Sequence, residues 1–109
     1  MFRALFGNDI IEKILLFLYT RGEGYPREIS STFKGQLTSY LLQLKKLEKG
    51  GVIASKLKGR TRMYVFNPRY PFLKELKALL DKALIFIPKS EKEKYYIPRL
   101  RPRRSGKPL

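Results

Sequence analysis

Apolar residues recur at helical spacing early in the chain. Ile10, Ile14, Leu15 and Leu18 lie three or four residues apart, which predicts an amphipathic helix from about Asp9 to Tyr19 with one buried stripe. Glycines follow at positions 22 and 24 and indicate that the helix ends there. We therefore expect this segment to build the core.

A short helix and a longer one are predicted next. The short helix runs from about Pro26 to Phe33, because proline suits a first helical turn. The longer helix runs from about Gln36 to Lys49, and its inward residues are Leu37, Tyr40, Leu41, Leu44 and Leu47. Lys34-Gly35 between the two predicts a sharp turn, so the expected order is helix, turn, helix.

Alternating apolar and polar residues then predict a hairpin. The strands are Val52–Leu57 and Arg62–Phe66, and Gly59 permits a tight tip between them. The residues expected to face inward are Ile53, Leu57, Tyr64 and Phe66. Basic residues occupy alternate positions from the first strand through the tip, at Lys56, Lys58, Arg60 and Arg62.

A last helix, from about Pro71 to Ile87, has a wide apolar face. One stripe consists of Leu73, Leu76, Leu80 and Leu84, and beside it lie Leu79, Ala83 and Phe86. One small domain cannot easily cover so wide a face. We predict that this helix is part core and part dimer interface, with the four-leucine stripe at the interface. Simple closure of the monomer core is the alternative.

Together these elements predict a mostly α fold with a small β-hairpin (α+β). This is the layout of a winged helix-turn-helix with a three-helix core, a wing, a C-terminal helix and a basic tail. The 109 residues suffice for one small domain, which we place at residues 1–87. Residues 88–109 form the tail, where Pro88, Pro98, Pro102 and Pro108 predict no regular element.

The charge of the chain changes the functional picture. There are 24 Lys and Arg against 9 Asp and Glu, a net charge of +15. Such an excess favours polyanions, nucleic acid before an anionic membrane, whereas a surface charged only for solubility keeps the two signs nearer balance. Eight of the basic residues but only one acidic residue, Glu48, lie between Lys34 and Arg62. Double-stranded DNA is therefore the expected partner.

Several other kinds of chemistry are not expected. The chain has no cysteine and no histidine, which removes disulfides, the usual zinc ligands and the usual general base. Its carboxylates are scattered and no phosphate-binding loop is visible, so we expect no enzyme activity, no metal and no cofactor. The chain has no apolar run of about 18 residues and no signal-peptide pattern. We expect no membrane partner and a cytoplasmic protein, nucleoid-associated if prokaryotic.

The candidate DNA contacts fall into three groups. Small polar side chains near a helix start suit base edges, and the candidates, with one leucine, are Gln36, Thr38, Ser39, Leu42 and Gln43. Candidates for the phosphate backbone are Lys34, Lys45, Lys46, Lys56, Lys58, Arg60 and Arg62. A basic arm in the tail, with Arg99, Arg101, Arg103 and Arg104, suits a minor groove or phosphates. The alternatives are a solvated helix face and a solvated terminus.

The stretch Leu44–Ile53, followed by Lys58–Tyr64, resembles the ArsR/MarR-like winged helix-turn-helix regulators. The shared pattern is a leucine-rich helix followed by Gly-Val-Ile, then a basic wing that ends in an aromatic residue. A start like Leu5-Phe6-Gly7 and the Asn67-Pro68 lead into the last helix look most like compact modules of this class that also occur fused to nucleotidyltransferase domains. The resemblance covers about residues 4–85.

The resemblance implies a recognition helix at 36–49 in the major groove, a basic wing at 56–62 on the backbone or minor groove, and terminal helices that dimerise. Metal-sensing members of the family bind metal through Cys or His, which this chain lacks. Leu42 also departs from the family pattern, which has a polar residue there. It either touches a thymine methyl group or is buried, which would shift the predicted helix faces.

Three function classes follow from the sequence. We favour a sequence-specific transcriptional regulator that binds duplex DNA as a homodimer. A general nucleic-acid or RNA-binding adaptor would use the basic tail with Tyr95 and Tyr96, and a protein-interaction module would use the last helix. An effector pocket between the first and last helices would be lined by Phe2, Phe6, Phe17, Phe72 and Phe86, although such aromatics usually form core.

Overall fold

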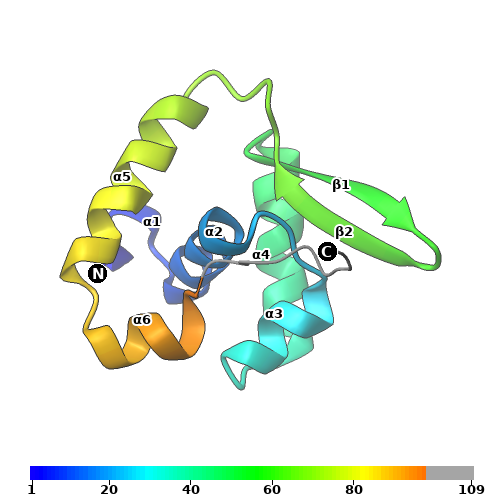
Figure 1. The fold of residues 1–109 in the computed structure, drawn as a ribbon. Coiled ribbons are helices and arrows are strands. Elements are labelled where there is room, and N and C mark those ends of the chain that lie inside the picture. Colours follow the sequence, from blue (N-terminus) through cyan, green and yellow to red (C-terminus); the bar gives the residue numbers. More distant parts are fainter. Residues whose placement is uncertain (98–109) are drawn as a thin grey trace, which may run out of the picture.

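The computed structural model describes residues 1–97 and arranges them as helices around a two-stranded hairpin (Figure 1). In chain order the elements are α1 (Arg3–Phe6), α2 (Asp9–Arg21), α3 (Pro26–Thr32), α4 (Leu37–Lys49), β1 (Ile53–Lys58), β2 (Thr61–Phe66), α5 (Leu73–Phe86) and α6 (Lys89–Tyr95). This confirms the mostly helical α+β fold. The predicted helices and strands are all present, with ends shifted by one or two residues.

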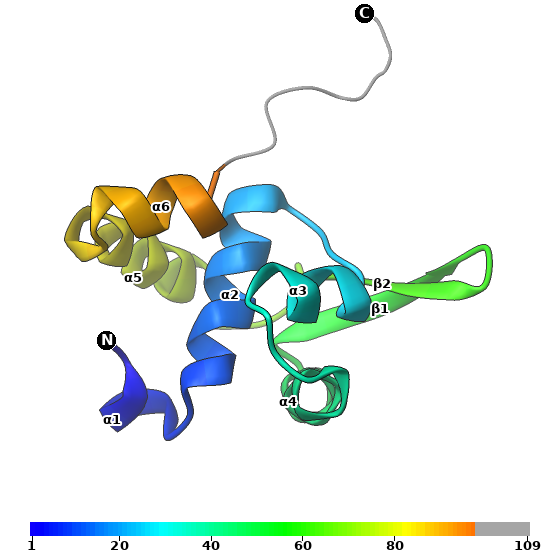
Figure 2. The same ribbon diagram turned by 90° about the horizontal axis from the view of Figure 1, so that it is seen from below.

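The helix α2 lies at the centre of the fold. Figure 2 shows α5 and α6 on one side of α2, and α3, α4 and the hairpin on the other. Five successive residues of α2, from Ile14 to Leu18, are buried, so a single stripe does not describe this helix. Asn8 caps its first turn, because its Oδ1 accepts hydrogen bonds from the backbone N–H groups of Ile10 (2.7 Å) and Ile11 (3.3 Å).

The helices α3 and α4 are joined by the predicted sharp turn. Lys34 has a φ of 55° and the neighbouring Gly35 packs beneath the ring of Tyr40, where a Cβ atom would collide with it. Ile29 in α3 and Tyr40 and Leu44 in α4 are buried against α2 in one apolar cluster. These contacts set the angle at which α4 crosses the body and leave its opposite face open.

The hairpin β1–β2, called the wing below, is antiparallel with Ile53 opposite Phe66 and Lys58 opposite Thr61. The loop before α3 adds a bridge to the free edge of β2, where Gly24 and Tyr64 exchange two backbone hydrogen bonds of 2.9 and 3.0 Å. A Cβ at Gly24 would lie 2.7 Å from Cε1 of Phe17, so glycine allows this close approach. The base of the wing is thereby joined to the helical core.

The predicted inward direction of Leu57 is wrong. Its side chain is 65 % exposed, while Met63, which the sequence pattern did not place inside, is 3 % exposed. Leu57 does lie on the same face of β1 as the buried Ile53, as the alternation of the strand predicts. The strand, however, continues past the edge of the core, so position 57 has nothing to pack against.

The helix α5 packs on α2, and its leucine stripe faces the core of the monomer. Leu80 is fully buried, and Leu73, Leu76 and Leu84 are partly buried against the same cluster. The prediction that these four leucines form a free interface is therefore wrong for Leu80 and weakened for the others. The large apolar side chains that α5 and its N-cap expose are Phe72, Ile85 and Phe86.

The two short helices α1 and α6 were not predicted. The helix α6 contradicts the expectation that prolines prevent a regular element after residue 87. Pro88 stands at its N-cap, where the missing N–H costs nothing. Tyr95 and Tyr96 then pack on Phe33, with ring centroids 5.1 and 5.8 Å away, and Tyr96 is 5 % exposed. The predicted tail contacts Arg99, Arg101, Arg103 and Arg104 lie outside the described residues.

Candidate nucleic-acid interface

The helix α4 presents a continuous outward face. Leu42 is 59 % exposed, and residues at helical spacing from it are exposed as well, namely Thr38, Lys45, Lys46 and Lys49. Gln36, at the N-cap, is exposed and Ser39 is half-buried. Of the five predicted base contacts, four are thus accessible. Lys49, which was not among the predicted contacts, extends this face by one turn.

Gln43 does not belong to the outward face. Its side chain is 6 % exposed, and its Oε1 atom is buried without a hydrogen-bond partner among the described residues. Position 43 lies three residues after Tyr40 and four before Leu47, so helical geometry places it at the edge of the buried stripe. The polar side chain concealed this position in the sequence pattern, and Gln43 is not retained as a base contact.

The basic residues of the wing lie on both of its faces. Cross-strand partners share a face, so Lys56 lies with Met63 on one side and Leu57 lies with Arg62 on the other. Lys56, Lys58, Arg60 and Arg62 are all exposed. Lys58 Nζ lies 3.9 Å from a carboxylate oxygen of Glu23, a loose surface pair that neutralises little of the charge.

A short chain of hydrogen bonds fixes the wing against α4. Arg62 Nη1 donates to Ser55 Oγ (3.1 Å), and Ser55 Oγ donates to Glu48 Oε2 (2.6 Å) near the end of α4. At the other end of the hairpin, Asn67 Nδ2 donates to the carbonyl oxygen of Gly51 (2.9 Å). The helix face and the wing are therefore held as one surface.

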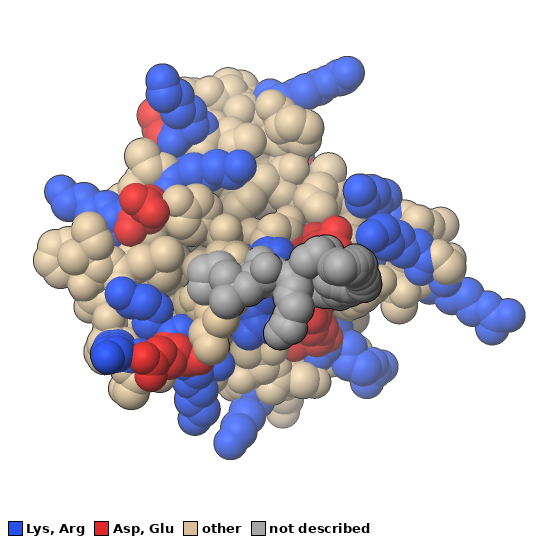
Figure 3. Space-filling view, viewed as in Figure 1, with Lys and Arg blue, Asp and Glu red and all other residues tan. Residues whose placement is uncertain are grey.

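This combined surface is strongly cationic. The segment from Lys34 to Arg62 holds eight Lys or Arg residues and one acidic residue, Glu48, a formal charge of +7, and all eight basic side chains are exposed. Figure 3 shows Lys and Arg side chains gathered over the wing, which projects at the right of the view. A surface of this kind attracts a polyanion through the summed field of its charges.

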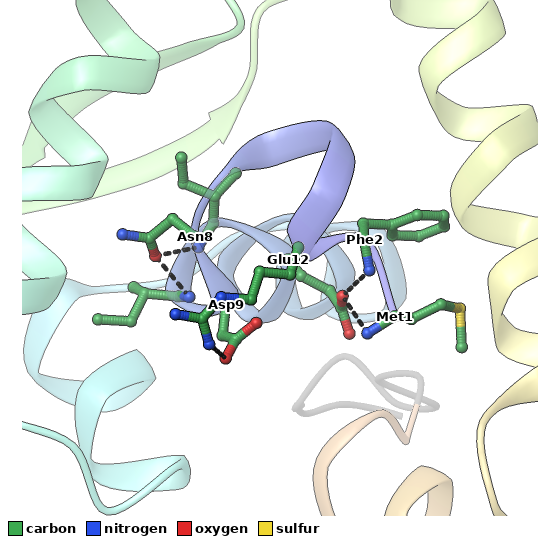
Figure 4. Close-up of polar contacts among 8 residues, drawn as sticks. Met1, Phe2, Asn8, Asp9 and Glu12 are labelled. Carbon is green, nitrogen blue, oxygen red and sulfur yellow. Dashed lines mark hydrogen bonds and ion pairs between the residues drawn. The ribbon is translucent and has the colours of Figure 1, made fainter.

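A second feature lies at the N-terminus, away from the wing. Glu12 Oε1 accepts a hydrogen bond from the backbone N–H of Phe2 (2.6 Å) and lies 3.0 Å from the amino group of Met1 (Figure 4). These contacts hold the N-terminal residues beside α5. Between them is an apolar cavity of about 370 Å³, lined by Met1, Phe2, Leu79, Lys82, Ala83 and Phe86.

The predicted aromatic pocket is divided by the fold. Phe2 and Phe86 line the cavity of about 370 Å³, whereas Phe6 lines a separate one of about 220 Å³. Phe17 is fully buried in the core, and Phe72 is 62 % exposed. The five phenylalanines do not form one effector site.

Helix, turn and helix, followed by a hairpin packed on the second helix, define a winged-helix type of fold. Neither a family model nor a curated protein matches the sequence. Among solved structures, a double mutant of Lactococcus lactis ZitR is similar, with a TM-score of 0.55 and 18 % identity over 79 % of this chain. The match spans 66 % of the ZitR chain. At this identity the likeness shows a shared fold.

Two negative findings apply to residues 1–97. No helix there is long and apolar enough to cross a bilayer. In the same residues no group of three or more Asp and Glu side chains is placed to hold a metal ion.

Proposed function

We propose that this protein is a sequence-specific transcriptional regulator that binds double-stranded DNA as a homodimer. The observation that carries the proposal is the joint surface of α4 and the wing, where eight exposed basic side chains surround a helix face of small polar and apolar residues. An α-helix fits the major groove of B-DNA, which is about 12 Å wide. The likeness to ZitR supports the winged-helix fold on which this proposal rests.

In this proposal the outward face of α4 enters the major groove. Gln36, Thr38 and Ser39 lie at its start, where short polar side chains reach base edges. Leu42, one turn further on, meets a thymine methyl group. The residues assigned to phosphates are Lys34, Lys45, Lys46, Lys49, Lys56, Lys58, Arg60 and Arg62.

The dimer interface is assigned to a different part of α5 from the leucine stripe. Phe86 is 65 % exposed and Ile85 is 72 % exposed, and the apolar cavity beside Met1 and Phe2 opens between α5 and the N-terminal residues. An exposed apolar surface of this sort suits a second copy of the chain. To read two successive major grooves, a dimer formed there must place its two α4 helices about 34 Å apart, one turn of DNA.

The test is a fluorescence-anisotropy titration of the full chain against random duplex DNA, single-stranded DNA and structured RNA at two salt concentrations. The proposal requires duplex preference and an affinity that falls steeply with salt. Arg60→Ala should weaken binding to all duplexes alike and reduce the salt slope by about one unit. The matched control is Lys89→Ala, because Lys89 is exposed on α6, away from the wing.

Equal or tighter binding to RNA would instead favour an RNA-binding adaptor. No binding to any nucleic acid at low salt would contradict the proposal and favour a protein-interaction module.

A further inference from the structure

Leu57 is an apolar side chain among the exposed basic residues of the wing. It is 65 % exposed near the tip of the wing, with Lys56 and Lys58 on either side of it in the chain and Arg62 opposite it across the strands. A solvated basic hairpin does not need a leucine there. Single exposed leucines are common on protein surfaces. The direction of the Leu57 side chain relative to α4 therefore decides whether it can contact DNA.

The face of the wing that carries Leu57 is turned toward α4. Ser55, two residues before Leu57 on the same face of β1, donates its hydrogen bond to Glu48 of α4. Leu57 therefore lies further out on the side of the wing that borders the outward face of α4. A duplex that lies against both α4 and the wing would meet Leu57.

The wing is long enough to reach beyond the groove that α4 would occupy. On β1, Leu57 lies four residues beyond the buried Ile53, which corresponds to about 13 Å of extended chain. That distance is close to the major-groove width of about 12 Å, and the tip of the wing reaches further. Figure 1 shows the wing projecting from the body beyond α4. With α4 in the major groove, the outer part of the wing would cross the phosphate backbone toward the adjacent minor groove.

We infer that Leu57 lies in this minor groove and selects A·T over G·C base pairs there. The inference rests on the proposed function and adds a sequence preference to it. A G·C pair places the guanine N2 amino group in the minor groove, whereas an A·T pair has only acceptors. A leucine side chain cannot accept a hydrogen bond from that amino group and would displace the water that does. An A·T pair lets the leucine approach the floor of the groove without this loss.

Inosine isolates this effect, because it is guanine without the N2 amino group. We would titrate the full chain with three duplexes of equal length, alternating A·T, alternating I·C and alternating G·C, at one salt concentration. I·C and G·C duplexes present the same groups in the major groove and differ in the minor groove. The wild type should bind the A·T and I·C duplexes more tightly than G·C by about 5- to 100-fold, the range that one unfavourable base pair costs.

Leu57→Ala should bring the affinities for I·C and G·C to within about twofold of each other, because alanine does not fill the groove. Leu5→Ala is the matched control, since Leu5 is 69 % exposed on α1, away from the wing. The ratio of its affinities for the I·C and G·C duplexes should equal that of the wild type.

Two results would overturn the inference while leaving the proposed function intact. One is equal binding of I·C and G·C by the wild type. The other is an unchanged I·C preference in Leu57→Ala, which would assign the preference to groove width read by the arginines. Failure to bind any of the three duplexes would overturn the inference and the proposed function together.

Discussion

Ser55 donates a hydrogen bond of 2.6 Å to Glu48, and this bond joins the wing to the last turn of α4. The same serine oxygen accepts a hydrogen bond from Arg62. The serine thus lies between a carboxylate and a guanidinium that belong to different elements. It fixes the direction of the wing relative to the helix face beside it.

Ser55→Ala should therefore affect both stability and DNA binding. Loss of a hydrogen bond to a charged group should lower the free energy of unfolding by about 1 to 3 kcal/mol, measured by urea unfolding. Affinity for duplex DNA should fall as well, because the wing is less firmly held. Ser90→Ala is the control, since Ser90 is exposed on α6. Equal stability of the two variants would mean that the Ser55–Glu48 bond contributes nothing in solution.

Substitution of Gln43 should stabilise the protein, whereas Ser55→Ala should destabilise it. Gln43→Met should raise the free energy of unfolding by about 1 to 3 kcal/mol, because it removes a buried polar atom that lacks a partner among the described residues. DNA affinity should remain unchanged. Gln36→Met, at the exposed start of α4, should leave stability unchanged and weaken DNA binding. A weaker complex for Gln43→Met would return Gln43 to the interface.

The proposed dimer can be tested by substituting two exposed phenylalanines, Phe86 at the end of α5 and Phe72 at its N-cap. Phe86→Asp places a charge beside the apolar cavity of α5 and should convert a dimer to a monomer, measured by light scattering after size exclusion. Phe72→Asp should leave the mass unchanged, because Phe72 is similarly exposed but does not line that cavity. A monomeric wild type at every accessible concentration would contradict the dimer.

Alkaline conditions should weaken the attachment of α6. Burial raises the pKa of Tyr96, and the nearby carboxylates of Glu12 and Glu91 raise it further. The unfolded-state pKa of tyrosine is about 10, so the folded state holds the phenol proton more tightly. The stabilisation is complete below about pH 10 and is lost as the pH rises toward the folded-state pKa. Tyr96→Phe should retain more of its stability above pH 10 than the wild type, measured by urea unfolding at pH 8 and pH 11. An identical loss of unfolding free energy in both proteins between pH 8 and pH 11 would contradict a destabilising ionisation of Tyr96.

The sequence predicted those elements whose apolar residues follow a regular period. The helices α2, α4 and α5 have apolar residues at helical spacing, and their bounds differ from the prediction by one or two residues. The helix α6 escaped prediction because its sequence is almost wholly charged and its start is marked by a proline. Its position depends on Tyr95 and Tyr96 packing on Phe33, about 60 residues away in the chain, which no local pattern can reveal.

The direction of single side chains was harder to predict than the elements. Gln43 is polar but lies at the edge of a buried stripe, and Leu57 is apolar but lies past the end of the core. In both cases the period of the element was correct. Whether each side chain is buried depends on how far the neighbouring elements extend over it, and the sequence does not specify this.

The burial of Ile14 to Leu18 in α2 has a consequence for how this fold can vary. Those five positions have no solvent face, so nearly every substitution among them disturbs packing. The outward face of α4 and the tip of the wing contribute almost nothing to that cluster. Residues that would choose a DNA sequence are therefore separate from residues that hold the fold. New binding preferences can arise by substitution at the surface with little effect on folding.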